Sequence, residues 1–199
     1  MSSQVPRTGR RAPGEDIVAA ARRLLDEAGE NFTIQQLVDE AGIALQTFYR
    51  YFPGKDQLML AVLGEMVAEA CAAMALGAAA YTDPIERLEF LVTAPLRGLN
   101  RAGVPRGRLI TREHFRLLQI FPDGVRAATK PFSDLVVAVL EDAQRQSKLT
   151  PIDIERDAWA INRLVMTTYH QEAFSDLDGL DEVNDHLWRF CAAAVGHRV

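Results

Sequence analysis

Residues 33–55 read TIQQLVDEAGIALQTFYRYFPGK and hold the apolar spacing of two short helices. Thr33 and Gln36 match a capping box, in which the hydroxyl accepts from the third helical amide and the Gln side chain reaches back to the cap. Gly42 stands where a tight turn between crossed helices belongs, because glycine enters left-handed backbone conformations at little cost. The order of cap, helix, turn and second helix predicts a helix-turn-helix.

The second of these helices divides its side chains between two faces, and Pro53-Gly54 ends it. Apolar groups at three- and four-residue spacing predict a buried face made of Ile34, Leu37, Val38 and Ala41, then Leu45, Phe48 and Phe52. The outward face is left with an amide, a hydroxyl, a phenol and a guanidinium, which are groups that suit base edges and phosphates. A glycine between two short helices also occurs in many helical proteins that bind no DNA, but the joint pattern favours a DNA-reading unit.

The run GIALQTFYRYFPGKDQL, residues 42–58, resembles the recognition helix and following junction of the TetR (tetracycline repressor) family of bacterial transcriptional regulators. The positions that match the family pattern are Thr47, Tyr49, Phe52, Pro53 and Lys55. Ala44 departs from it, because the family usually has Ser or Thr there as the helix cap; the loss costs at most about 1 kcal/mol. The resemblance covers roughly the first quarter of the chain.

The resemblance implies an all-α fold with two parts. An N-terminal three-helix, homeodomain-like helix-turn-helix domain is expected over residues 1–54, and a helical ligand-binding and dimerisation domain over residues 55–199. Gln46 is expected to read bases, and Thr47 to contact both base and phosphate. The residues expected to hold the DNA backbone are Thr33, Tyr49, Arg50, Tyr51 and Lys55. Arg10 or Arg11 is expected to enter the minor groove from a basic arm, the alternative being a solvated tail.

The charge of the chain is distributed unevenly. The net charge is −5, but residues 1–55 hold seven Lys/Arg against seven Asp/Glu, so residues 56–199 hold fifteen against twenty. This asymmetry favours a local basic footprint over a protein that coats nucleic acid generally. The chain has no uninterrupted apolar run of ~20 residues and begins without an apolar secretory segment, so we expect a cytoplasmic protein. Cys71 and Cys191 are expected to be buried thiols, with neither a disulfide nor a zinc site.

The rest of the chain is predicted to be helical, with breaks at proline and glycine. We expect helices over 14–29, 55–80, 83–100 with a kink near Pro95, 108–120, 125–148 with a kink at Pro131, 153–174 and 180–197. A loop is expected over 101–107 and a break at 122–124. Apolar seams in the last two helices predict a four-helix dimer interface, as in the family: Ile154, Ala158, Ile161, Val165 and Thr168, then Leu180, Val183, Leu187, Phe190 and Ala194. The alternative is that these faces close the monomer's own core.

The family also implies a small-molecule site in the body. Its candidate lining is Met59, Met66, Met74, Phe90, Phe115, Trp159, Met166 and Tyr169, with His114 or His170 as polar anchors. No cofactor, metal or catalytic set is expected, because the four histidines are scattered and no phosphate loop or nucleophile motif occurs. The sequence therefore predicts a DNA-binding regulator that an apolar or amphipathic ligand releases from DNA. Regulation of this kind is most often repression. A helical protein-interaction module that has lost DNA binding, and a small helical enzyme, remain as alternatives.

Overall fold

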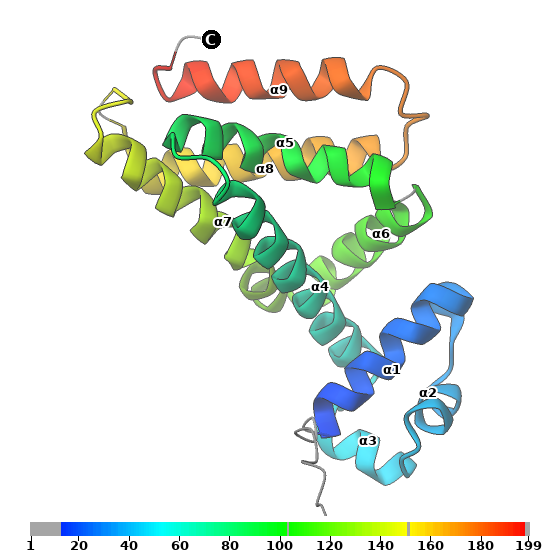
Figure 1. The fold of residues 1–199 in the computed structure, drawn as a ribbon. Coiled ribbons are helices and arrows are strands. Elements are labelled where there is room, and N and C mark those ends of the chain that lie inside the picture. Colours follow the sequence, from blue (N-terminus) through cyan, green and yellow to red (C-terminus); the bar gives the residue numbers. More distant parts are fainter. Residues whose placement is uncertain (1–12, 103, 151, 198–199) are drawn as a thin grey trace, which may run out of the picture. The chain divides into compact units, whose positions relative to one another are not determined.

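The computed structural model describes residues 13–102, 104–150 and 152–197, and all regular structure within them is helical (Figure 1). Contacts divide the chain into two compact units, Met1–Val62 and Leu63–Val199. The division falls inside the long helix α4 (Lys55–Ala78) rather than at its start. Because α4 runs through both units without a break, the functional boundary expected after residue 54 stays a prediction.

The first unit is built on three helices and the start of α4. They are α1 (Pro13–Ala28), α2 (Ile34–Ala41) and α3 (Leu45–Tyr51), with a 3-10 turn over Gly29–Asn31. α1 packs against α2, and α2 against α3. The largest fully buried side chains of this unit are Ile17, Leu37, Phe48, Leu58 and Val62. The three-helix arrangement expected for a helix-turn-helix is therefore present.

The local signals around the turn have the predicted geometry. Thr33 Oγ1 accepts from the Gln36 amide at 3.2 Å, and the Thr33 amide donates to Gln36 Oε1 at 2.7 Å, which completes the capping box. Gly42 ends α2 in the left-handed region, at φ 63°. Ala44 caps α3 without a side-chain hydrogen bond, as its methyl group requires.

The expected position of Leu45 is wrong, because its side chain is 44% exposed. Residues i and i+3 lie about 60° apart around a helix axis. Burial in α3 is centred on Phe48, which is fully buried, so Leu45 falls at the edge of the inner face.

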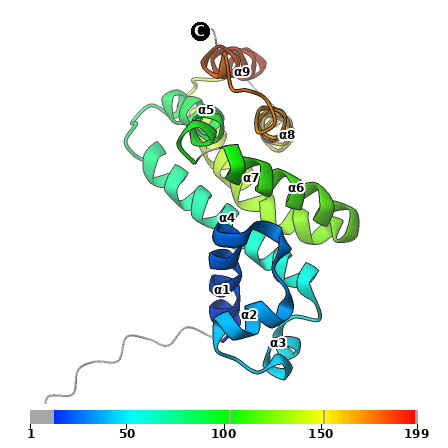
Figure 2. The ribbon, with the colours of Figure 1, turned by 90° about the vertical axis from the view of Figure 1, so that its right-hand side faces the viewer.

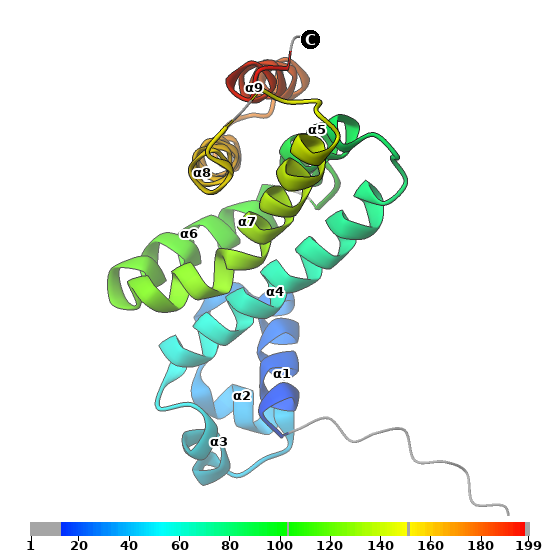
Figure 3. The same ribbon diagram turned by 90° about the vertical axis from the view of Figure 1, so that its left-hand side faces the viewer.

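The second unit is a bundle that surrounds α5. After the remainder of α4 come α5 (Pro84–Ala102), α6 (Val104–Ile120), α7 (Pro122–Arg145), α8 (Ile154–Glu172) and α9 (Leu180–Ala194). α5 packs against α7, α8 and α9. Figure 2 looks almost along α5, α8 and α9, which run side by side, and Figure 3 shows α6 and α7 crossing them from the other side.

Two of the expected breaks are wrong. Residues 101–102 and 104–107 are helical instead of forming a loop, because α5 continues to Ala102 and α6 begins at Val104. Pro122 begins α7 instead of interrupting the chain, since proline has no amide to lose in the first helical turn. α7 accordingly starts three residues early and ends at Arg145, where Ser147 takes a positive φ of 56°. Pro95 and Pro131 lie inside continuous helices.

Most of the apolar seam predicted for dimerisation faces the unit's own interior. Ala158, Ile161 and Val165 of α8, with Leu180 and Leu187 of α9, are buried in the core cluster. These helices pack along α5, so the seam at three- and four-residue spacing is satisfied within one chain. These buried residues close the chain's own core, whereas Phe190, 56% exposed, and Ala194 are exposed. A dimer interface through the last two helices stays a prediction.

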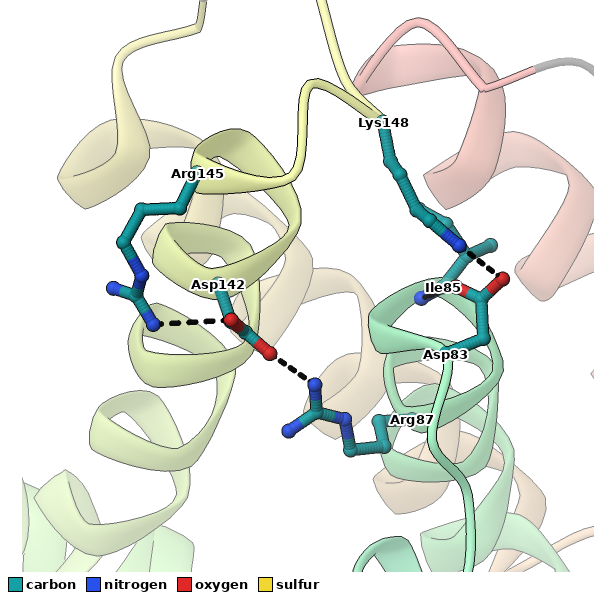
Figure 4. A network of polar contacts seen from close by, with 6 residues as sticks. All are labelled: Asp83, Ile85, Arg87, Asp142, Arg145 and Lys148. Atoms are coloured by element: carbon teal, nitrogen blue, oxygen red, sulfur yellow. Dashed lines mark hydrogen bonds and ion pairs between the residues drawn. The ribbon is translucent and has the colours of Figure 1, made fainter.

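Polar contacts join the start of α5 to the end of α7 (Figure 4). Asp83 accepts from the Ile85 amide at 2.8 Å and from Lys148, while Asp142 accepts from Arg87 and, at 3.1 Å, from Arg145. The hydrogen bonds from Lys148 and from Arg87 lower the pKa of Asp83 and of Asp142, respectively. Asp83 thus caps the start of α5, and its carboxylate also reaches Lys148, just beyond the end of α7.

By length and apolar composition, α4 is the one helix among the described residues that could cross a membrane. A single such helix is weak evidence, because long apolar helices of soluble proteins pass the same test.

Candidate nucleic-acid interface and effector site

The outer face of α3 presents the side chains predicted to meet DNA. Gln46 and Arg50 are exposed, Thr47 is half-buried, and Tyr49 is 50% exposed. Phe48 anchors the helix from behind, with its ring 5.2 Å from that of Tyr49 in an edge-to-face arrangement. A short helix held by one buried aromatic residue therefore displays an amide, a hydroxyl, a phenol and a guanidinium together.

Tyr51 is held at the edge of this surface. Its ring lies against Gly14 at the start of α1, where an added Cβ would approach Tyr51 Cδ1 to 3.4 Å. The Arg50 guanidinium lies over the same ring, 5.1 Å from its centre. The tyrosine thus orients the arginine next to it, which suits a pair that grips phosphate oxygens.

Lys55 has a structural contact that the sequence did not reveal. Its ammonium donates to the Phe32 carbonyl at 2.6 Å and lies 4.2 Å from the centre of the Phe32 ring. This contact joins the start of α4 to the residue just before the Thr33 cap. A phosphate contact by Lys55 stays a prediction, and removal of this side chain would also loosen the helix-turn-helix.

Three further residues were predicted to contact DNA: Thr33, Arg10 and Arg11. Thr33 is exposed but uses its hydroxyl in the capping box, including a 3.1 Å hydrogen bond to Gln36 Oε1. Arg10 and Arg11 lie outside the described residues. The expected minor-groove arm therefore remains a prediction from sequence.

The residues predicted to line an effector pocket do not form one cluster. Met59 is buried in the first unit, whereas Trp159 is 61% exposed under the guanidinium of Arg163. Phe90 is half-buried beside Tyr81. Met66, Met74 and Met166 are half-buried in the second unit. Ring contacts with one another are made by four of the candidates, His114, Phe115, Tyr169 and His170.

That cluster is formed by His114 and Phe115 of α6 with Tyr169 and His170 of α8. The rings of His114 and His170 are 4.7 Å apart between centres, and Phe115 is 5.1 Å from His170. Tyr169 meets His170 edge-to-face at 5.6 Å. Phe115 is 50% exposed and His114 half-buried, so the cluster reaches the surface, whereas His170 is buried.

Thr111 completes the cluster and was missed from sequence. Its Oγ1 lies 3.0 Å from His170 Nδ1, while His170 Nε2 is buried without a hydrogen-bond partner. Thr111 precedes His114 by three residues and so shares its helix face, which is the signal that could have found it. Burial lowers the pKa of His170 to about 4, with a further contribution from His114. Burial, then the charge of Arg163, lowers the pKa of His114.

Comparisons with known proteins agree with this architecture. Residues 17–62 match the model of bacterial regulatory proteins of the tetR family. The HTH-type transcriptional repressor KstR of Mycobacterium tuberculosis is 32% identical over 113 residues, which cover 56% of this chain and 49% of KstR. The aligned region thus spans about half the length of that curated relative.

Two solved structures share the fold across nearly the whole chain. FadR from Bacillus subtilis in complex with stearoyl-CoA gives a TM-score of 0.69 at 15% identity, covering 92% of this chain and 97% of that one. FadR from Thermus thermophilus in complex with lauroyl-CoA gives 0.68 at 23% identity, covering 88% and 92%. The fold and the exposed face of α3 define a helix-turn-helix protein with a helical body. Over residues 17–62 the chain is similar to bacterial regulatory proteins of the tetR family.

Proposed function

We propose that this protein is a sequence-specific DNA-binding transcriptional regulator, a repressor released by a small apolar or amphipathic ligand. The observation that carries the proposal is the outer face of α3, where Gln46, Thr47, Tyr49 and Arg50 stand together on a helix anchored by Phe48. As a regulator of chromosomal genes, it would act in the cytoplasm.

Within this surface the residues have different tasks. Gln46 is exposed and its amide can pair with both the donor and the acceptor edge of adenine in the major groove. Tyr49 and the Arg50–Tyr51 pair carry groups suited to phosphates, which fix position without reading sequence. Thr47 lies between the two sets, where its methyl group can meet a thymine methyl.

The protein would act as a homodimer through α8 and α9. One recognition helix reads only a few base pairs, so two-fold pairing on a palindrome is the usual remedy. Exposed apolar side chains on these helices support this surface: Trp159 at 61%, Leu164 at 38% and Phe190 at 56% exposed. Phe190→Asp should yield monomers by sedimentation, whereas Arg189→Asp next to it, also exposed, should leave the dimer intact.

A ligand would act on the second unit. The two FadR structures were solved with acyl-CoA molecules, which supports an amphipathic ligand for this chain as well. Such a ligand relieves repression only as far as it binds the DNA-incompetent state more tightly than the competent one. α4 is one continuous helix shared by both units, which makes it the covalent route for that coupling.

The test is selection of genomic fragments by the purified full chain, with a Thr47→Ala, Tyr49→Ala double variant as control. We expect one palindromic site to be enriched by the parent protein and lost by the variant. If no fragment is enriched, even after the protein has been unfolded and refolded to strip bound ligand, the result would support the alternative of a protein-interaction module.

Two single variants then separate reading from positioning. Arg50→Ala should weaken binding to all sequences and reduce the salt dependence of affinity, because one phosphate contact is gone. Gln46→Ala should change which sequence is preferred. An unchanged preference would remove Gln46 from base readout.

A further inference from the structure

We propose that the His114–His170 pair is the polar anchor of the effector site and binds a carboxylate carried by an otherwise apolar molecule. This inference rests on the proposed function, since it names the ligand class of that regulator.

The first argument is an unsatisfied donor. His170 is 7% exposed, and its Nε2 has no hydrogen-bond partner. A buried polar atom left without a partner destabilises the fold, so such atoms in folded proteins call for an explanation. A ligand that brings its own polar atom to Nε2 supplies one.

The second argument concerns which nitrogen carries the proton. Thr93, Thr129 and Thr168 lie inside helices and donate their hydroxyl hydrogen to the carbonyl four residues earlier. Thr111 is also inside a helix, but its partner among the described residues is His170 Nδ1, at 3.0 Å. Because no hydrogen bond from Thr111 to a carbonyl of its own helix is found among the described residues, we assign its hydroxyl as the donor to Nδ1; this assignment makes Nδ1 the acceptor and places the proton on Nε2. Nε2 is then a hydrogen-bond donor, and the partner that it lacks is an acceptor oxygen.

The third argument is the charge around the pair. Among the described residues, the charged side chain that shifts the pKa of His114 is Arg163 of α8, and no carboxylate shifts the pKa of either imidazole. The nearest acid in sequence, Glu113, is buried and held by Arg116 at 2.8 Å. Glu172 accepts from Ser175 at 2.8 Å. An anionic oxygen at Nε2 would meet a donor and a positive surrounding charge, whereas an amine would meet repulsion.

The apolar part of the ligand has a matching surface. Phe115 is 50% exposed beside His170, and Tyr169 covers another edge of the same imidazole. An alkyl or ring group would cover Phe115. Because Nε2 is buried, α6 and α8 would have to move apart locally to admit the carboxylate to it.

Titration calorimetry of the full chain with octanoate, methyl octanoate and octylamine tests the ligand class. We expect octanoate to bind most tightly and octylamine not to bind. His170→Phe keeps a ring but removes both nitrogens, and should weaken octanoate binding by about 10- to 100-fold, as loss of a charge-assisted hydrogen bond does. His186→Phe is the matched control, because His186 is exposed on α9, and should bind octanoate like the parent protein. No octanoate binding, equal binding of octylamine, or an unchanged affinity in His170→Phe would overturn the proposal.

Nitrogen-15 NMR of the imidazoles tests the anchor without any ligand. We expect His170 as the Nε2–H tautomer in the parent protein, and a shift toward Nδ1–H in Thr111→Val, which keeps the shape but removes the hydroxyl. The Nδ1–H tautomer in the parent protein would overturn the proposal. Genomic selection separates this failure from failure of the proposed function: if octanoate binding or the tautomer fails the test but the parent protein enriches a palindrome, the regulator stands and only the carboxylate site is rejected.

Discussion

The helix-turn-helix unit and the helical body differ in how far apart in the chain their contacting residues lie. In the first unit, Lys55 bonds to Phe32 and Arg23 to Glu40, which are 23 and 17 residues apart. In the body, Asn184 of α9 donates to the Thr93 carbonyl of α5 across 91 residues, and Arg108 donates to the Ala173 carbonyl across 65. The first unit is specified by neighbours and the body by distant helices.

This difference agrees with where the family model matches the chain. Caps, a left-handed glycine and one buried aromatic residue specify the helix-turn-helix, and its pattern is recognised over residues 17–62. The fold as a whole is shared with the Bacillus subtilis FadR structure at 15% identity, over 92% of this chain. Cores of this kind tolerate many apolar substitutions as long as volume and patterning are kept.

The largest expected effect would separate the two units physically. Phe48→Ala removes a fully buried ring from the small unit and should destabilise it by about 3–5 kcal/mol, while the body stays folded. Hydrogen exchange resolved by segment should show loss of protection in α1–α3 only. Tyr49→Ala removes an equally large but half-exposed ring and should abolish DNA affinity without this loss. A single collapse of both units in Phe48→Ala would show that they unfold as one.

The second prediction concerns how the stability of the body depends on pH. The His170 pKa lies at about 4 in the folded state against an ordinary 6.5, so the unfolded chain binds more protons between these values. Stability is therefore full above pH 6.5 and falls as pH is lowered toward 4, by about 2 kcal/mol between about pH 7 and pH 5.

Urea unfolding monitored on the body measures this dependence, with His170→Gln as the variant that cannot take up the proton. Its stability should change less over the same pH interval. The lowered pKa values of Asp83 and Asp142 act only near and below their ordinary 3.8, outside that interval. An identical slope in both proteins would assign the acid loss to other groups.

A third test replaces one glycine in each unit, and we expect the two substitutions to change the free energy of unfolding in opposite directions. Gly42→Ala forces a side chain into φ 63° and should destabilise the first unit by about 1–2 kcal/mol. Gly98→Ala lies in helical α5 with nothing within 4 Å of the new Cβ and should stabilise the body by up to about 1 kcal/mol. Thermal unfolding of the two variants gives the comparison, and stabilisation by Gly42→Ala would contradict the turn geometry.

The smallest effect repairs the departure from the family pattern. Ala44→Ser supplies the side-chain cap that α3 lacks and should stabilise the first unit by about 0.5–1 kcal/mol. Chemical denaturation of this variant beside Thr33→Ser, which keeps its cap, measures the gain. No gain would mean that the α3 amides already have other partners.

The candidate DNA surface could be predicted almost entirely from sequence, because its side chains lie within one helix and its periodicity sets which of them point outward. Leu45 was misplaced because periodicity alone does not locate the edge of a buried face. The effector site could be predicted only in part. The sequence predicts His114 and His170 as polar anchors, but it also predicts Met59, which lies in the first unit, and Trp159, which is exposed under Arg163. No local pattern tells which residues of two helices will meet 56 positions apart.

The sequence by itself determined the helix-turn-helix, its capping box and turn, the display of Gln46, Thr47, Tyr49 and Arg50, and the helical nature of the body. These features depend on interactions over three or four residues, which the chain carries locally. Only the tertiary structure decided that Lys55 is bound to Phe32, that the seams of α8 and α9 close the core, and that Thr111 fixes His170 beside His114. These contacts join segments whose meeting depends on how every helix of the unit packs, so the physical reason lies in the packed core as a whole.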